Sequence, residues 1–208
     1  MSNFKAAILD IYFRASELRR SEKGSFSVEG VLMFPILLWA YIGMYVFFEG
    51  LRENNINLKA AYTIGDLLSR ETELVDMAYF DGMNDVFGWL TRSQNPVSMR
   101  VTVVRYDEVS DSHVLVWSRG VAGKPDLIQN DVDTIISPEV PILADADTAI
   151  VVETWARFEP IMEIGLTSSD IYNLVVTPPR FAEQLMFVGV GDGGGNTHND
   201  GNEGDTGL

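Results

Sequence analysis

Three residues with a defined spacing stand before a long apolar segment of this 208-residue chain: Gly24, Ser25 and Glu29. Cleavage after Gly24 would expose the amine of Ser25, four positions before Glu29 and therefore on the same face of a helix. A carboxylate at the edge of a bilayer is costly unless it is paired, and a new amine on a neighbouring subunit is a natural partner. The spacing therefore suits proteolytic processing followed by assembly of helices.

Glu29 also has a purely structural interpretation, because a carboxylate near a helix N-terminus is favoured by the helix dipole. The position of Gly24, the basic residues before it and the immediate start of the apolar segment favour processing over that interpretation.

The apolar segment, residues 30–48, contains 19 consecutive residues without a charge. As a helix it would be roughly 28 Å long, close to the hydrocarbon thickness of a bilayer. A buried core helix would usually show a polar stripe, and a secretory signal peptide would end in small residues of the A-x-A type. Neither feature is present, so we predict a single transmembrane helix, and we expect Pro35, Trp39 and Gly43 to contribute to its packing with other helices.

Charge is divided unevenly around this segment. The chain has 15 Lys and Arg against 30 Asp and Glu, a formal net charge of −15. Residues 1–28 hold five basic and three acidic residues, whereas residues 49–208 hold 10 basic and 26 acidic ones. Because basic loops stay on the cytoplasmic side, we expect a cytoplasmic N-terminus and a periplasmic body. So acidic a chain is unsuited to nucleic acid, and its 11% aromatic content excludes a wholly disordered protein.

The chain has few residues of the types that act in catalysis, because it contains no cysteine and only two histidines. His113 falls in an expected strand, where a paired or exposed histidine is the usual case, and no known catalytic or zinc motif is present. We therefore expect no enzyme activity, no cofactor and no metal site.

Residues 189–208 contain eight glycines and four acidic residues, and we expect them to be disordered. Residues 189–194 fit G-x-G-x-x-G without a following helix, so a nucleotide site is not expected. Asn196, His198 and Asp200 resemble a calcium loop only faintly, since Gly207 stands where its glutamate should be.

Periodicity predicts the remaining elements. The helix should continue through residues 51–69, and a less regular helix should cover 71–90, with Gly82 as a break and residues 94–96 as its stop. We expect a hairpin of strands 97–106 and 113–119, a central strand within 144–158 and a last strand at 171–177. Three tryptophans are expected in the core or the hairpin, with a place of one of them on a partner surface as the alternative: Trp89, Trp117 and Trp155.

These elements predict an α+β fold with a pilin-like layout, in which a long N-terminal transmembrane helix precedes a C-terminal antiparallel sheet. We divide the chain into a basic cytoplasmic leader (1–24), the transmembrane helix with its periplasmic extension (25–70), a periplasmic α+β domain (71–188) and the tail (189–208).

The junction carries a family resemblance. A basic leader, a glycine and a glutamate five residues later resemble the type IV prepilin signature, whose peptidases cut after the glycine. More specifically, residues 20–49, with Pro35 at the family position, look like the N-terminus of the TadE/TadG-like pilus-assembly proteins. The similarity continues in residues 60–70, in the strand pair of 97–117 and in 177–181.

Two departures refine the resemblance. Flp-type major pilins usually carry an aromatic residue after the glutamate, whereas Gly30 follows here, and the D-x-S-x-S motif of longer TadG-type members is missing. The resemblance thus implies a minor pseudopilin of a tight-adherence (Flp) pilus, held in the bacterial inner membrane. Its implied partners are a prepilin peptidase, major and minor pilins and the pilus assembly platform. The alternative is an unprocessed single-pass scaffold or binding protein of the assembly or secretion machine.

Overall fold

The computed structural model describes residues 25–162 and 165–189, and the side chains within its first helix from Val28 onward. The predicted leader, the cleavage position Gly24 and almost all of the glycine-rich tail, with its two weak motifs, lie outside the described residues. The chain order of elements is α2 (Ser25–Ser69), α3 (Met77–Thr91), β1 (Val97–Asp107), β2 (Ser112–Val121), α4 (Gln129–Asp131), the π-helical turn η2 (Val132–Ile136), β3 (Thr148–Phe158) and β4 (Ser169–Thr177).

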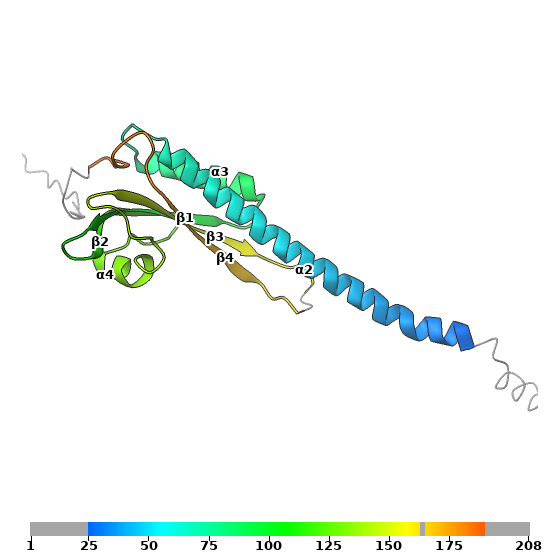
Figure 1. The fold of residues 1–208 in the computed structure, drawn as a ribbon. Helices are drawn as coiled ribbons and strands as arrows, with labels where there is room; N and C mark the ends of the chain where they lie inside the picture. Colours follow the sequence, from blue (N-terminus) through cyan, green and yellow to red (C-terminus); the bar gives the residue numbers. More distant parts are fainter. Residues whose placement is uncertain (1–24, 163–164, 190–208) are drawn as a thin grey trace, which may run out of the picture.

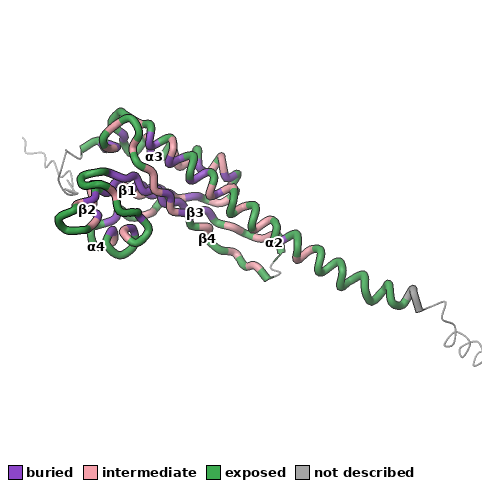
Figure 2. The backbone as a smooth tube through the Cα atoms, in the orientation of Figure 1, coloured by how far each residue is buried: buried purple, intermediate pink, exposed green. Residues whose placement is uncertain are grey.

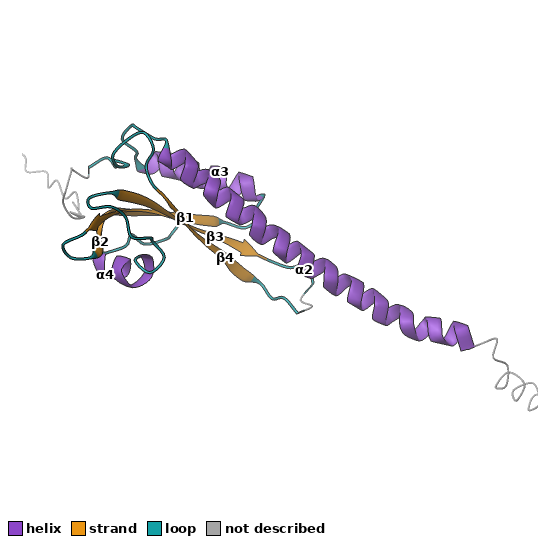
Figure 3. Cartoon of the chain, viewed as in Figure 1, coloured by secondary structure: helices purple, strands orange, loops and turns teal. Residues whose placement is uncertain are grey.

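One long helix dominates the shape of the molecule (Figure 1). Helix α2 has 45 residues, which at 1.5 Å per residue corresponds to about 68 Å, and it continues through Pro35. Its first half projects beyond the rest of the chain, and its second half lies along the sheet (Figure 3). The prediction that the apolar helix continues through residues 51–69 is confirmed, and so is the α+β class.

The four strands form one antiparallel sheet in the order β2-β1-β3-β4. Val101 pairs with Val152, and Val152 in turn pairs with Val175. The predicted hairpin is β1 and β2, the predicted central strand is β3, and the predicted last strand is β4. Both inner strands are rich in β-branched residues, which pack well on a pleated surface buried on both sides.

Each face of the sheet has its own apolar core, and the buried residues gather on the inner strands and on the parts of the helices beside them (Figure 2). Alternate residues of β1, including Met99 and Val101, pack under α2 and α3 together with Ile64, Phe80 and Trp117. On the opposite face a smaller core forms between the strands and the segment that contains α4 and η2. Its buried members are Val104, Leu127, Val132, Ile136, Val140, Ala149 and Val151.

Several local predictions are wrong. The second helix begins at Met77, where Asp76 accepts a hydrogen bond from the Tyr79 N–H at 2.8 Å, and residue 71 is not helical. Gly82 does not break it, because it lies exposed inside α3. The helix ends at Thr91, one residue after the predicted end, but its stop is Arg92 in a left-handed C-cap conformation (φ 53°) and not residues 94–96.

The tryptophan predictions divide. Trp117 is a core residue, and its indole N–H donates to the Leu185 carbonyl at 3.0 Å. Trp155 is half-buried on the sheet. The expectation for Trp89 is wrong, because its side chain is 78% exposed on the outer face of α3. The sequence shows that Trp89 lies in a helical segment, but it does not show which side of that helix packs on the sheet.

Candidate functional site

The first half of α2 is the most unusual surface of the molecule. Val28–Ser69 is long and apolar enough to cross a membrane by length and composition, and only 6% of its most apolar 18-residue stretch is buried. Soluble proteins rarely expose so large a continuous apolar surface. The exposed side chains come from every side of the helix: Val31, Leu32, Phe34, Leu37, Trp39, Tyr41 and Met44.

The residues predicted to act in assembly are spread along this half. Glu29 is exposed near its start and has no side-chain partner among the residues that the structure describes. Ser25 is the first residue of α2, and Gly24 lies outside the description. Pro35 and Trp39 are exposed and Gly43 is half-buried. Their spacing of four residues places Pro35, Trp39 and Gly43 on one face of the helix.

The loop between β3 and β4 approaches α2 where the uncharged segment ends. A Cβ atom added to Gly50 would lie 3.1 Å from Leu166 Cδ1, and one added to Gly165 would lie 3.3 Å from the ring of Phe47. Val46 is buried at the same level. The sheet domain is thus held closely against the helix at residues 46–50.

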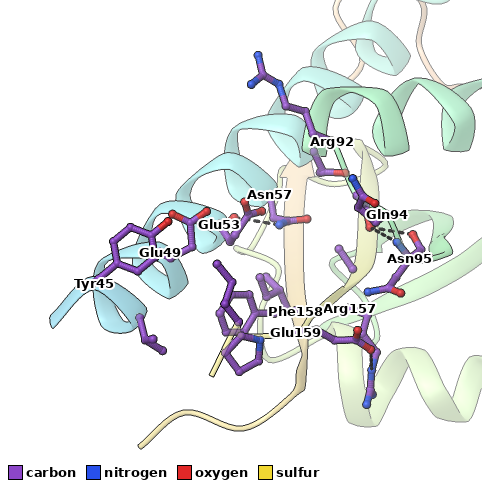
Figure 4. Close-up of a pocket in the computed structure, with 17 residues that line it drawn as sticks. Tyr45, Glu49, Glu53, Asn57, Arg92, Gln94, Asn95, Arg157, Phe158 and Glu159 are labelled. Atoms are coloured by element: carbon purple, nitrogen blue, oxygen red, sulfur yellow. Dashed lines mark hydrogen bonds and ion pairs between the residues drawn. The ribbon is translucent and has the colours of Figure 1, made fainter. Parts of the chain in front are cut away.

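A pocket of about 270 Å³ opens beside this contact (Figure 4). One wall is a row of α2 side chains spaced by four residues: Tyr45, Glu49, Glu53 and Asn57. The opposite wall comes from residues 91–95, which begin at the last residue of α3, and from residues 156–161 at the end of β3. Three elements that are distant in sequence therefore meet around one cavity at the end of the uncharged segment.

Two acceptor groups in this pocket have no partner among the described residues. Asn57 is only 2% exposed; its Nδ2 donates to the Glu53 carbonyl at 2.9 Å, and its Oδ1 accepts nothing. No described residue forms an ion pair or hydrogen bond with the half-buried Glu53 carboxylate. A buried acceptor without a donor is uncommon in folded proteins, so Asn57 Oδ1 is an open acceptor in the pocket lining, and the part-exposed Glu53 carboxylate is a second one.

The other charged groups at the pocket are already engaged or face away. Glu49 Oε1 lies 3.0 Å from Arg52 Nη1. Arg157 forms ion pairs with Glu159 at 3.5 Å and with Asp170 at 3.3 Å. The Arg92 side chain extends away from Glu53 and Asn57 in Figure 4. Glu53 is therefore the one carboxylate of the lining that has no ion pair among the described residues, and it gives the pocket its acidic character.

Most other polar side chains of the sheet have structural partners, although Thr154 Oγ1 on β3 and Asn173 Nδ2 on β4 are buried without one among the described residues. His113 is buried, with Nδ1 2.8 Å from Ser137 Oγ and Nε2 3.3 Å from the Pro141 carbonyl, as expected for a paired histidine. Arg100 and Glu153 form a buried ion pair to which Tyr172 adds a hydrogen bond. Within residues 25–162 and 165–189 there is no group of three or more His, Cys, Asp or Glu that could hold a metal ion.

Three tyrosines on the sheet domain have a raised pKa: Tyr106, chiefly through its hydrogen bond to Asp111, and Tyr79 and Tyr172, chiefly through burial. Burial, followed by the nearby Glu71 carboxylate, raises the pKa of Tyr79 to about 12. Burial and the negative charge of Glu153, which also accepts the phenol hydrogen bond, raise the pKa of Tyr172 further. The phenols of Tyr79 and Tyr172 therefore remain neutral donors at physiological pH and serve structure.

Comparison with protein families, with curated proteins and with solved structures found no match to this chain. Functional inference therefore depends on two features of the geometry, the exposed apolar half of α2 and the acidic pocket at its end.

Sequence reasoning missed the pocket. The spacing of Tyr45, Glu49, Glu53 and Asn57 is visible in the sequence, but it resembles the ordinary solvated face of a helix leaving a membrane. Nothing in the sequence indicates that residues 91–95 and 156–161 fold against that face.

Proposed function

We propose that the chain is a minor pseudopilin of a tight-adherence (Flp) pilus system, anchored in the bacterial inner membrane and cleaved by a prepilin peptidase after Gly24. The observation that carries the proposal is the division of α2 into an exposed apolar half and a half packed on an antiparallel sheet. A subunit of this shape can stay in a bilayer or enter a bundle of helices without rearranging its folded domain.

Energetics support burial of the exposed half in lipid or among other helices. Burial of a large apolar side chain contributes about 1.5–3 kcal/mol, and the exposed segment carries many of them. A bilayer and a bundle of similar helices both remove this surface from water. The basic leader before the segment favours a cytoplasmic N-terminus, which leaves the sheet in the periplasm.

Glu29 is the residue on which assembly should depend. Its carboxylate is exposed at the beginning of the apolar stretch, and no described residue of its own chain pairs with it. After cleavage, the amine of Ser25 on a neighbouring subunit would supply the missing positive charge. Partners in this proposal are the prepilin peptidase, major and minor pilins and the assembly platform.

An unprocessed single-pass scaffold of the assembly or secretion machine is the second candidate. The pocket beside α2 favours it, because a binding site at the end of the anchor functions without release of the helix from the membrane.

The role of Glu29 is tested by co-isolation with the major pilin. Glu29→Ala should insert in the membrane as the wild type does but lose co-isolation, because the neighbour's amine has no carboxylate to meet. Glu73→Ala, which removes an exposed carboxylate from the connection between α2 and α3, is the matched control and should retain it. Undiminished co-isolation of Glu29→Ala would contradict the proposed pairing.

A further inference from the structure

The acidic pocket lies at the depth of lipid headgroups if residues 30–48 span the hydrocarbon. Glu49, Glu53 and Asn57 follow Phe48 by one, five and nine residues, so they stand about 1.5, 7.5 and 13.5 Å beyond the end of the segment. The polar layer on each side of a bilayer is about 5–8 Å thick. The backbone of Glu53 therefore stands at the outer edge of the headgroup layer, and that of Asn57 stands about 6 Å farther out. The Asn57 amide reaches back toward the membrane by one turn, because its Nδ2 donates to the Glu53 carbonyl.

The chemistry of the pocket selects a cation that carries N–H groups. A carboxylate and an amide oxygen are both acceptors, and neither Glu53 nor Asn57 Oδ1 has a described partner. An ammonium group supplies three donors together with a positive charge, which satisfies both acceptors at once. Below them, the pocket is lined by apolar side chains, among them Val46, Phe158 and Ile161.

The surroundings of the pocket point to a lipid as the source of that ammonium. Ile161 is 76% exposed and Met162 is half-exposed beside the pocket, at the loop that packs on residues 47–50 of α2. Apolar side chains exposed at this depth would enter the boundary between headgroups and acyl chains. A volume of about 270 Å³ is slightly below the usual range for small-molecule sites, so it admits a headgroup and leaves acyl chains in the bilayer.

We propose that this pocket binds the primary ammonium headgroup of a phospholipid of the phosphatidylethanolamine class, with Glu53 and Asn57 as its acceptors. The bound headgroup fixes the height and rotation of the sheet domain over the membrane. This inference rests on the membrane placement of α2 in the proposed function, and it is independent of cleavage after Gly24.

The test uses the full chain reconstituted in nanodiscs that contain equimolar phosphatidylethanolamine and phosphatidylcholine in a phosphatidylglycerol background. Lipids that stay bound after release from the disc are counted by native mass spectrometry. Phosphatidylcholine is the informative competitor, because its quaternary ammonium has the same charge but no N–H to donate. The wild type should retain phosphatidylethanolamine about tenfold over phosphatidylcholine, as expected for one charge-assisted hydrogen bond.

Glu53→Gln should abolish this preference, whereas Asp85→Asn, which neutralises an exposed carboxylate on α3, should keep it. Equal retention of the two lipids by the wild type, or an unchanged preference in Glu53→Gln, overturns the proposal. Association of copies through Glu53 without retained lipid also overturns it, and assigns the pocket to a protein amine. A chain that enters no disc of any composition contradicts the membrane placement itself, which separates that failure from loss of headgroup selectivity.

Discussion

Arg100 and Glu153 face each other across β1 and β3 as a bidentate ion pair, with Nε 2.7 Å from Oε2 and Nη2 2.8 Å from Oε1. Both side chains are buried, and the Tyr172 hydroxyl donates to Glu153 Oε1 at 2.9 Å. The guanidinium also lies 5.2 Å from the ring centroid of Trp155. The guanidinium and the phenol hydroxyl both donate to the Glu153 carboxylate, so this network fixes the register of the inner strands. Because the two charges pair with each other, neither is free to act on a ligand.

Removal of one partner of this pair should destabilise the domain strongly. Glu153→Gln leaves the buried Arg100 without a counter-charge, and we expect a loss of about 3–5 kcal/mol in the free energy of unfolding. Urea titration of the detergent-solubilised protein measures it. The double variant Arg100→Met/Glu153→Leu should recover most of the loss, because apolar residues need no compensation there. A loss below about 1 kcal/mol in Glu153→Gln would show that the pair is hydrated or dispensable.

Two glycines should respond to alanine in opposite directions. A Cβ atom at Gly120 would overlap the Lys124 carbonyl oxygen, a backbone atom that cannot move aside easily, so Gly120→Ala should cost about 1–3 kcal/mol. Gly82 is exposed inside α3 with nothing within 4 Å, so Gly82→Ala should stabilise by about 0.5–1 kcal/mol. Thermal unfolding monitored by circular dichroism compares them, and a drop in Tm for Gly82→Ala would contradict its placement in the helix.

Stability should decline at alkaline pH through the two shielded tyrosines. The pKa of Tyr79 is about 12 in the folded chain and that of Tyr172 is raised further, so at pH 10–12 the unfolded chain loses these protons before the folded chain does. Their contribution is complete below pH 10 and is lost as pH rises toward and through the folded pKa values. Urea midpoints between pH 8 and 11.5 should fall less in Tyr79→Phe and Tyr172→Phe than in the wild type. Identical pH profiles would contradict the shifts.

The orientation of the anchor can be tested through a single introduced thiol, because the chain has no cysteine. Val109 is 96% exposed in the turn between β1 and β2. Val109→Cys should react with a membrane-impermeant maleimide once the outer membrane is permeabilised, and the cysteine-free parent should not. Labelling that requires rupture of the inner membrane would place the sheet in the cytoplasm.

The sequence predicts the elements of this fold well where local periodicity determines them. Residues 97–106 and 113–119 alternate clearly enough to predict the hairpin, and the apolar run of 149–152, with three β-branched residues, predicts an inner strand. Local periodicity does not predict helix boundaries that depend on capping residues; α3, for example, begins after the N-cap Asp76 and not at residue 71. The segment that covers the second face of the sheet is not predicted, because residues 126–143 show neither helical nor strand periodicity. Packing of Leu127, Val132 and Ile136 on the sheet orders this segment.

The candidate sites divide in the same way. The apolar segment and Glu29 are local features, so the sequence alone indicates them. The pocket and the Arg100–Glu153 pair join residues from distant parts of the chain. From the sequence alone, Arg100 on a strand is expected to face solvent, and only the pairing of β1 with β3 brings Glu153 beside it. Contacts of this kind follow from sheet register and helix docking, which no short pattern encodes.

N-terminal sequencing of the protein isolated from membranes of the native host tests cleavage after Gly24 directly. We expect Ser25 as the first residue, with loss of the 24-residue leader, and we expect Gly24→Leu to block this cleavage and yield a slower-migrating, full-length product. A membrane-bound protein that begins at Met1 or Ser2, together with unchanged migration of Gly24→Leu, would contradict processing and leave the unprocessed scaffold as the function.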